Sequence, residues 1–212
     1  MDKKIKRSPL FYVGDKYKLM QQLLHYFPQK INNFHEPFVG GGTVFLNVKA
    51  KKYYLNDIDR NLIGIHKFLV KSSKNPKKFF NDVEKKIHKY NLSRSYKEDV
   101  VPNELKKKWK KTYFAKFNNQ GYKSLRDRVN KKNSKEDSLI LYLLLIYGFN
   151  RMLRFNKEGR FNLPVGNVDF NKNVASALRD YFDFVKNKKI LLSSKDFRSH
   201  LSGKNLFKND FV

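Results

Sequence analysis

The hydrophobic pattern of the first 72 residues alternates between helical and strand periodicity. Apolar residues have helical spacing over 18–27, where the run stops at Pro28, and over 43–50, where Thr43 is a candidate N-cap. Short apolar stretches at 34–39 and 53–58 indicate strands, and 60–71 indicates another helix. A strand, a glycine turn, a helix, a strand and a helix in this order predict a parallel α/β sheet.

The pattern changes after residue 72. From 74 to about 137 the chain is lysine-rich with helical periodicity, and the strongly apolar run 139–147 predicts a buried helix. After a polar, glycine-punctuated loop region, the pattern predicts a helix at 174–187, a strand at 189–193 and the start of a strand at 209–212. We therefore expect one α/β domain built from 1–72 and 165–212, interrupted by a mostly helical insertion at 73–164.

Charge narrows the class of partner. The chain has 46 Lys and Arg against 19 Asp and Glu, a formal net charge of +27 that favours a polyanion such as nucleic acid. Anionic lipid and an AT-rich genome are competing explanations, although no basic amphipathic stretch with a continuous apolar face stands out. No apolar run approaches the ~20 residues of a membrane span, and without cysteine no thiolate metal site exists. We expect a cytoplasmic protein without membrane or metal.

The run EPFVGGGTVFLN at 36–47 is the sharpest local signal. Its glycines let the backbone approach a ligand closely, but they match neither the dinucleotide GxGxxG nor a Walker loop, so a plain tight turn is the alternative. Asp57 ends the next predicted strand, where ligands bind in open α/β sheets and where an acid suits a ribose diol. Its alternative role is a helix N-cap, which Asp59 can fill equally well, so we assign the ribose to Asp57 and the cap to Asp59.

Ordered motifs then give a resemblance to a known family. The chain resembles the Dam-type DNA adenine-N6 methyltransferases of the D12 class, through an aromatic-x-G-x-K-like segment at 11–16, the EPFVGGG run at 36–42, the acid Asp57, and the segments 147–156 and 159–166. The resemblance covers most of the chain from residue 10 onward. It implies a Rossmann-like S-adenosylmethionine-dependent methyltransferase sheet, here incomplete, with a helical DNA-recognition insertion.

The resemblance also implies cofactor contacts. An aromatic ring would pack on S-adenosylmethionine, a lysine would meet its carboxylate, the glycine turn would cradle its methionine part, and an acid would take the ribose hydroxyls. A Ser-x-Asp-Phe segment after the strand 189–193 sits where related enzymes hold the adenine, although such a segment is also a common turn. The implied cofactor-binding residues are Tyr12, Lys16, Phe38, Gly40, Gly42, Asp57, Asp196 and Phe197.

Three further residues match family positions that contact double-stranded DNA. Arg154 matches an arginine that reads guanine, whose O6 and N7 a guanidinium can bind bidentately, and this hints at GATC-like sites. Phe149 and Asn150 match residues at the gap that a flipped adenine leaves. The family usually has a small residue where Arg151 stands. The lysines of 106–111 are either phosphate contacts or a solvated face. The resemblance also implies a cognate restriction endonuclease system as a possible partner.

The catalytic tetrapeptide of the family, D-P-P-Y or a close variant, is not in this sequence. None of the six prolines are adjacent: Pro9, Pro28, Pro37, Pro76, Pro102 and Pro164. The run 208–212 resembles the residues that lead into that motif. We therefore assign no catalytic residue and expect the 212 residues alone to be inactive. The alternatives are a non-catalytic DNA- or cofactor-binding remnant, one chain of a split methyltransferase, or a basic RNA-binding protein, which leaves the glycine turn and Asp57 unexplained.

Overall fold

The structure is a computed structural model that describes residues 4–97, 101–131, 137–202 and 206–212. The chain divides into two compact units. The first consists of Met1–Lys74 and Ala177–Val212, and the second of Asn75–Ser176. Each unit buries its own set of apolar side chains.

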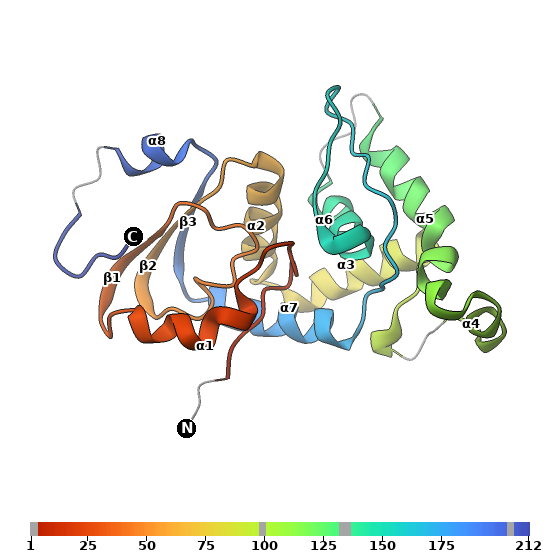
Figure 1. The fold of residues 1–212 in the computed structure, drawn as a ribbon, viewed down its shortest axis with the longest axis horizontal. Coiled ribbons are helices and arrows are strands. Elements are labelled where there is room, and N and C mark those ends of the chain that lie inside the picture. The colour runs from red at the N-terminus through yellow and green to blue at the C-terminus, as the bar shows by residue number, and fades with distance from the viewer. Residues whose placement is uncertain (1–3, 98–100, 132–136, 203–205) are drawn as a thin grey trace. The chain divides into compact units, whose positions relative to one another are not determined.

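The first unit contains an open sheet of three parallel strands. These are β1 (Ile31–Glu36), β2 (Ala50–Asn56) and β3 (Lys189–Ser193), in the order β1-β2-β3 (Figure 1). The register places Tyr53 of β2 opposite Phe34 and Ile190. The sheet confirms the predicted α/β class, and β3 has the bounds that the pattern predicts.

Aromatic side chains form the core on one face of this sheet. Tyr53 is fully buried, and its ring lies 6.2 Å from the Phe34 ring, 6.2 Å from Phe45 and 5.7 Å from Phe184. The Tyr53 hydroxyl donates to Val48 O and accepts from the Ala50 N–H, both at 2.9 Å, so the buried polar group is satisfied. The core thus holds the loop before β2 against the sheet.

Helices surround the strands of the first unit. The predicted helix at 18–27 is an irregular series of η1 (Tyr17–Leu19), α1 (Met20–Leu23) and η2 (Leu24–Tyr26), which ends before Pro28. The predicted helices at 60–71 and 174–187 are α2 (Arg60–Ser72) and α7 (Lys172–Val185), and the first residues of α7, up to Ser176, belong to the second unit. A short helix, α8 (Phe197–Leu201), follows β3.

The predicted helix at 43–50 is wrong. Residues 43–47 form consecutive turns, and Thr43 caps nothing: its buried hydroxyl has no hydrogen-bond partner among the described residues. The N–H of Phe45 donates to the Glu36 carboxylate at 3.2 Å instead of to a helical carbonyl. Asn47 Nδ2 donates to Thr43 O at 2.8 Å. One backbone bond of the helical type remains, from the Val48 N–H to Val44 O at 3.2 Å. The bond to Glu36, from outside the segment, and the bond from the Asn47 side chain, within it, stabilise turns instead of a continuous helix.

The bounds of two strands also differ from the sequence prediction. β1 covers 31–36 instead of 34–39, because Pro37 brings no N–H and Gly40 (φ +48°) turns the chain away. β2 covers 50–56 instead of 53–58, because the Asp57 side chain accepts the Asp59 N–H at 3.0 Å and starts the turn into α2. The predicted strand start at 209–212 is a single parallel bridge between Phe211 and Phe34.

The second unit is mostly helical in the part of the chain that the structure describes. Its elements are α3 (Pro76–Lys89), η3 (Ser95–Lys97), α4 (Asn103–Trp109), η4 (Lys110–Thr112), α5 (Tyr113–Val129), α6 (Ser138–Tyr147) and η5 (Phe149–Arg151). Asp137 caps α6 by accepting the N–H groups of Leu139 and Ile140. Nine of the ten residues of α6 are buried, as its apolar run predicts.

Gly121 allows a close backbone approach within the second unit. A Cβ at this position of α5 would lie 2.0 Å from the carbonyl oxygen of Tyr90, the residue that follows α3. Only glycine allows two segments to pack at this separation. Throughout the described ranges of both units, no helix has the length and apolar character that crossing a membrane requires.

Candidate cofactor and DNA sites

The glycine turn follows β1 at the carboxyl end of the sheet. Gly40 (φ +48°) and Gly42 (φ +83°) both have left-handed backbone conformations, which favour glycine. The turn closes with a hydrogen bond from the Gly42 N–H to Val39 O at 2.7 Å. The Val39 N–H donates to Asn56 O at 2.8 Å, which ties the turn to the end of β2. The turn is therefore fixed to two neighbouring strand ends.

Asp57 and Asp59, which follow β2, accept hydrogen bonds from different backbone segments. Asp57 accepts the Gly40 N–H on Oδ2 and the Asp59 N–H on Oδ1, both at 3.0 Å. Asp59 accepts the N–H groups of Asn61 and Leu62 at 2.8 and 3.3 Å, so the predicted N-cap of α2 is confirmed. The carboxylate of Asp57 is thus aligned with the glycine turn, and its ribose role stays a prediction.

His66 holds the same turn from the other side, and the sequence analysis did not single it out. His66 Nε2 lies 2.8 Å from Gly40 O, so this nitrogen donates and Gly40 is bonded through both its N–H and its carbonyl. Burial lowers the pKa of His66, which keeps the imidazole neutral. The sequence signal that could have pointed to His66 is its place on the buried face of the 60–71 helix.

Glu36 is the second side chain whose position in the site could not be read from the sequence. It ends β1, and its carboxylate accepts the Phe45 N–H. Although Glu36 is only partly buried as a residue, desolvation of its carboxyl group raises its pKa to about 8. The Phe45 N–H opposes this shift, and the nearby Asp57 carboxylate adds to it.

Glu36→Gln is expected to stabilise the protein more at pH 8 than at pH 5. The folded-state pKa of Glu36 lies near 8 and its ordinary value is 4.5, so the wild-type protein loses stability as pH rises through this window. The neutral amide keeps an acceptor for the Phe45 N–H and does not ionise. Urea unfolding at four pH values should show the difference in unfolding free energy growing by about 3–4 kcal/mol between pH 5 and pH 8. A difference that is equal at pH 5 and pH 8 would contradict the assignment.

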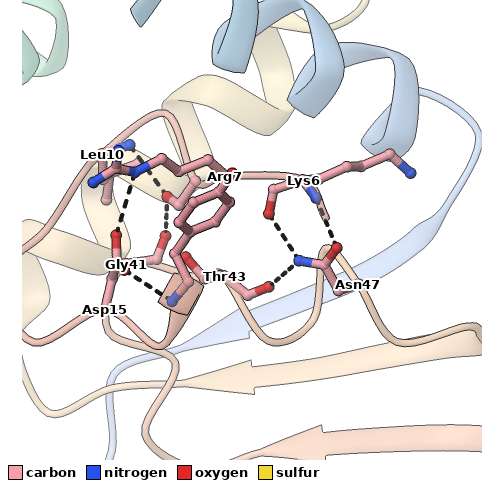
Figure 2. Close-up of polar contacts among 9 residues, drawn as sticks. Lys6, Arg7, Leu10, Asp15, Gly41, Thr43 and Asn47 are labelled. Atoms are coloured by element: carbon pink, nitrogen blue, oxygen red, sulfur yellow. Dashed lines mark hydrogen bonds and ion pairs between the residues drawn. The ribbon is translucent and has the colours of Figure 1, made fainter. Parts of the chain in front are cut away.

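The N-terminal segment packs onto the glycine turn (Figure 2). Ser8 Oγ donates to Gly41 O and accepts the Leu10 N–H. Asn47 binds Lys6 twice: its Oδ1 accepts the Lys6 N–H and its Nδ2 donates to Lys6 O, both at 2.8 Å. These bonds hold the residues before Tyr12 against the turn.

This packing places the two N-terminal candidates differently. Tyr12 is half-buried beside the turn, where a Cβ on Gly41 would lie 3.0 Å from Tyr12 Cβ. Lys16 is exposed, and its Nζ donates to Gly14 O at 2.9 Å. Tyr12 is therefore next to the glycine turn, whereas the Lys16 ammonium is bound to its own loop.

Two exposed aromatic rings meet at the carboxyl end of the sheet. The rings of Phe38 and Phe197 lie 5.2 Å apart, and the two residues are 68% and 41% exposed. Asp196 caps α8 and also binds the Arg198 guanidinium with both carboxylate oxygens, and these bonds lower the pKa of Asp196. The turn-forming alternative for this segment matches these contacts, and a role of Asp196 and Phe197 at an adenine ring stays a prediction.

Gly42→Ala is expected to destabilise the first unit by about 2–3 kcal/mol, through backbone strain and a steric clash. The new Cβ would lie 2.5 Å from Phe45 Cε1 and 3.0 Å from His66 Cε1. Gly14→Ala is the matched control, because Gly14 has a similar φ of +77° with no atom within 4 Å. It should cost only about 1 kcal/mol of strain. Equal losses in circular-dichroism melts of the two variants would refute the steric part.

The candidate DNA residues lie on irregular backbone after α6. Phe149 is 50% exposed, and its N–H donates to Pro164 O at 3.0 Å. Asn150 (φ +51°) and Arg151 (φ +48°) both have left-handed conformations, which are costly for a non-glycine residue and above all for arginine. The segment therefore presents an exposed ring and an amide on a constrained turn.

Arg154 is exposed on the loop that follows, and its guanidinium binds Asn162. No group of three or more His, Asp or Glu side chains suited to a metal ion occurs among the residues that the structure describes.

Comparisons with known proteins identify the family of the chain. A family model described as "D12 class N6 adenine-specific DNA methyltransferase" matches residues 12–206. The chain is similar to the modification methylase StsI of Streptococcus sanguinis, at 29% identity over 99% of this chain and 28% of that protein. It is 29% identical to the type II methyltransferase M.FokI of Planomicrobium okeanokoites, over 97% of this chain and 28% of that protein.

A shorter relative matches as well. The DNA adenine methylase of Haemophilus influenzae is 31% identical over 77% of this chain and 48% of its own length. The chain therefore spans between about a quarter and a half of the curated relatives that it matches. Since the family model covers nearly the whole sequence, the chain belongs to the D12 class of N6 adenine-specific DNA methyltransferases.

Proposed function

We propose that this chain binds S-adenosylmethionine in its first unit and double-stranded DNA in its second, as part of an enzyme that methylates adenine N6. The observation that carries the proposal is the convergence of the glycine turn and the Asp57 carboxylate at the ends of adjacent parallel strands. When bound, the cofactor supplies a sulfonium methyl group. The residues of this chain bind and orient it.

The chemistry of the turn suits the cofactor. Each carboxylate has about four acceptor positions, and Asp57 uses two of them for backbone N–H groups. The remaining positions suit a ribose diol, and the bond to Gly40 keeps the turn and the ribose acceptor in register. Phe38 and Phe197 offer flat apolar surfaces for an adenine ring, while Tyr12 and the turn from Gly40 to Gly42 would contact the methionine part.

The second unit carries the candidate DNA-binding residues, which are exposed and lie on a constrained turn and the loop after it. We propose that Phe149 and Asn150 occupy the space that a flipped adenine leaves, since a flat ring can replace a lost stacking partner. Arg154 would read a guanine edge. Exposed lysines at Lys107, Lys108, Lys110 and Lys111 would contact phosphates without reading sequence.

Equilibrium binding of S-adenosylmethionine, followed by titration calorimetry, tests the first part. We expect saturable binding with one site per chain, and competition by S-adenosylhomocysteine but not by ATP. No heat of binding at cofactor concentrations up to the millimolar range would sink the proposal. Binding of labelled duplex DNA, with affinity that falls steeply with salt, tests the second part.

We further propose that the 212 residues bind both ligands without transferring the methyl group, because the D-P-P-Y tetrapeptide is not among them. In this family, that tetrapeptide is expected to accept the hydrogen bonds of the target amino group. Incubation with DNA and tritiated S-adenosylmethionine should leave the DNA unlabelled. Labelled N6-methyladenine in the digested DNA would overturn this part and leave the binding proposals intact.

The names of two relatives favour a restriction–modification role. StsI is described as a modification methylase and M.FokI as a type II methyltransferase. We propose that the enzyme protects DNA against a cognate endonuclease. Purified genomic DNA from the source cell should then resist digestion by that endonuclease, whereas the same DNA amplified without methylation should be cut.

A further inference from the structure

Arg154 is held by one neighbour through one edge of its guanidinium. Its Nε donates to Asn162 Oδ1, and its Nη2 donates to the backbone carbonyl of Asn162, both at 2.8 Å. Nε and Nη2 form the side edge of the planar group. Within the described residues, no hydrogen bond occupies the edge formed by Nη1 and the second hydrogen of Nη2, and Arg154 is exposed.

The position of Asn162 is set by a backbone frame that does not depend on the Arg154 side chain. The Asn162 N–H donates to Arg154 O at 3.0 Å, next to an antiparallel bridge between Phe155 and Phe161. The rings of these two phenylalanines lie 5.4 Å apart. Asn130, at the end of α5, accepts the Phe161 N–H at 2.8 Å and donates to Phe161 O at 2.9 Å. The loop is thus anchored to a helix at its base.

This arrangement selects the group that Arg154 can bind. A guanidinium has five N–H donors in one plane, and two of them are taken by Asn162. The remaining end edge offers two parallel donors, which match a planar acceptor pair such as O6 and N7 of guanine. A free arginine side chain has many rotamers, and fixing one of them before binding lowers the entropy lost per hydrogen bond.

We propose that Asn162 is a positioning residue that orients the end edge of Arg154 for a guanine in the major groove and so sharpens sequence discrimination. This inference rests on the proposed DNA-binding function. The phosphate backbone is the competing acceptor for the same edge, but a phosphate contact would affect all sequences alike. The two acceptors therefore predict different results for discrimination and for overall affinity.

The test selects bound duplexes from a random pool with the 212-residue chain and sequences them. The wild-type chain should enrich a site with a required guanine, and Arg154→Ala should lose that preference. Asn162→Ala should weaken the guanine preference about five- to tenfold while binding to unrelated duplexes changes less than twofold. Asn162→Asp keeps the Oδ1 acceptor. It should retain the preference but bind every duplex more weakly, because it adds a negative charge facing DNA.

Replacing the required guanine with 7-deazaguanine removes N7 and separates the two acceptors. It should weaken binding of the wild-type chain about tenfold and of Asn162→Ala by much less, because the oriented pair is already lost. If Asn162→Ala keeps the full guanine preference while Arg154→Ala loses it, the positioning role is wrong and the reading role of Arg154 stands. If Arg154→Ala keeps the preference too, both are wrong. Equal losses on all sequences would assign the edge to phosphate and overturn the inference.

Discussion

Asp57→Asn is expected to weaken S-adenosylmethionine binding by about 100-fold, which corresponds to about 3 kcal/mol. The carboxylate accepts the Gly40 and Asp59 N–H groups on separate oxygens. An amide supplies only one acceptor, so one N–H group would face the NH₂ donor and the turn would shift. The ribose diol would also lose its charged acceptor. Titration calorimetry with S-adenosylmethionine measures the effect.

Asp59→Asn is the matched control for this prediction. It removes the same charge two residues away, and asparagine caps helices as well as aspartate does, so the bonds to Asn61 and Leu62 can be kept. Its cofactor affinity should remain within about threefold of wild type, because the Asp59 carboxylate faces the N–H groups of α2 and its charge is partly screened by solvent. Comparable losses in the two variants would show that Asp57 acts through charge or helix stability and not through the turn.

Gly121→Ala is expected to destabilise the second unit by about 4 kcal/mol or more. Alanine normally stabilises a helix interior relative to glycine by about 1 kcal/mol, so packing must reverse the usual sign. The new Cβ would lie 2.0 Å from the Tyr90 carbonyl oxygen, which is backbone and cannot rotate away. Trp109, the one tryptophan of the chain, lies in α4, so its fluorescence reports unfolding of this unit during a urea titration.

Gly64→Ala provides the opposite case. Gly64 lies inside α2, and a Cβ there would meet no atom within 4 Å. This variant should gain up to about 1 kcal/mol, measured by circular dichroism. A Gly121→Ala protein that unfolds within 1 kcal/mol of wild type would show that α5 and the end of α3 can separate without cost.

Local signals made some of the fold predictable and left other parts out of reach. The strand at 189–193, the buried helix α6 and the Asp59 cap were predictable, because each depends on residues that lie within a few positions of one another. The segment 43–50 has helical spacing but forms turns between 43 and 47, because Glu36 binds the Phe45 N–H and Lys6 pairs with the Asn47 side chain. Hydrogen bonds between distant residues override a local preference of a few tenths of a kcal/mol per residue.

In the candidate site, too, some features could be predicted from the sequence and others could not. Asp57 and the glycine turn could be found from their order along the chain, since parallel strands bring their carboxyl ends together. The bond from His66 to Gly40 spans 26 positions. The hydrogen bond from Arg154 to Asn162 spans eight positions. Neither pairing has a periodic or motif signature, so only coordinates reveal which side chain orients which group.

Helix α6, buried on nearly every side, determines how the second unit can open. Its backbone amides combine helical hydrogen bonding with buried leucine, isoleucine and tyrosine side chains of the helix, so we expect partial fraying to bring little water to them. Hydrogen–deuterium exchange at these amides therefore measures the free energy of opening the whole unit. The exposed residues around Phe149 and Asn150 can exchange through small local openings. If DNA slows exchange only at the amides around Phe149 and Asn150, it binds a preformed surface. If DNA also slows exchange in α6, it stabilises the entire fold of the unit.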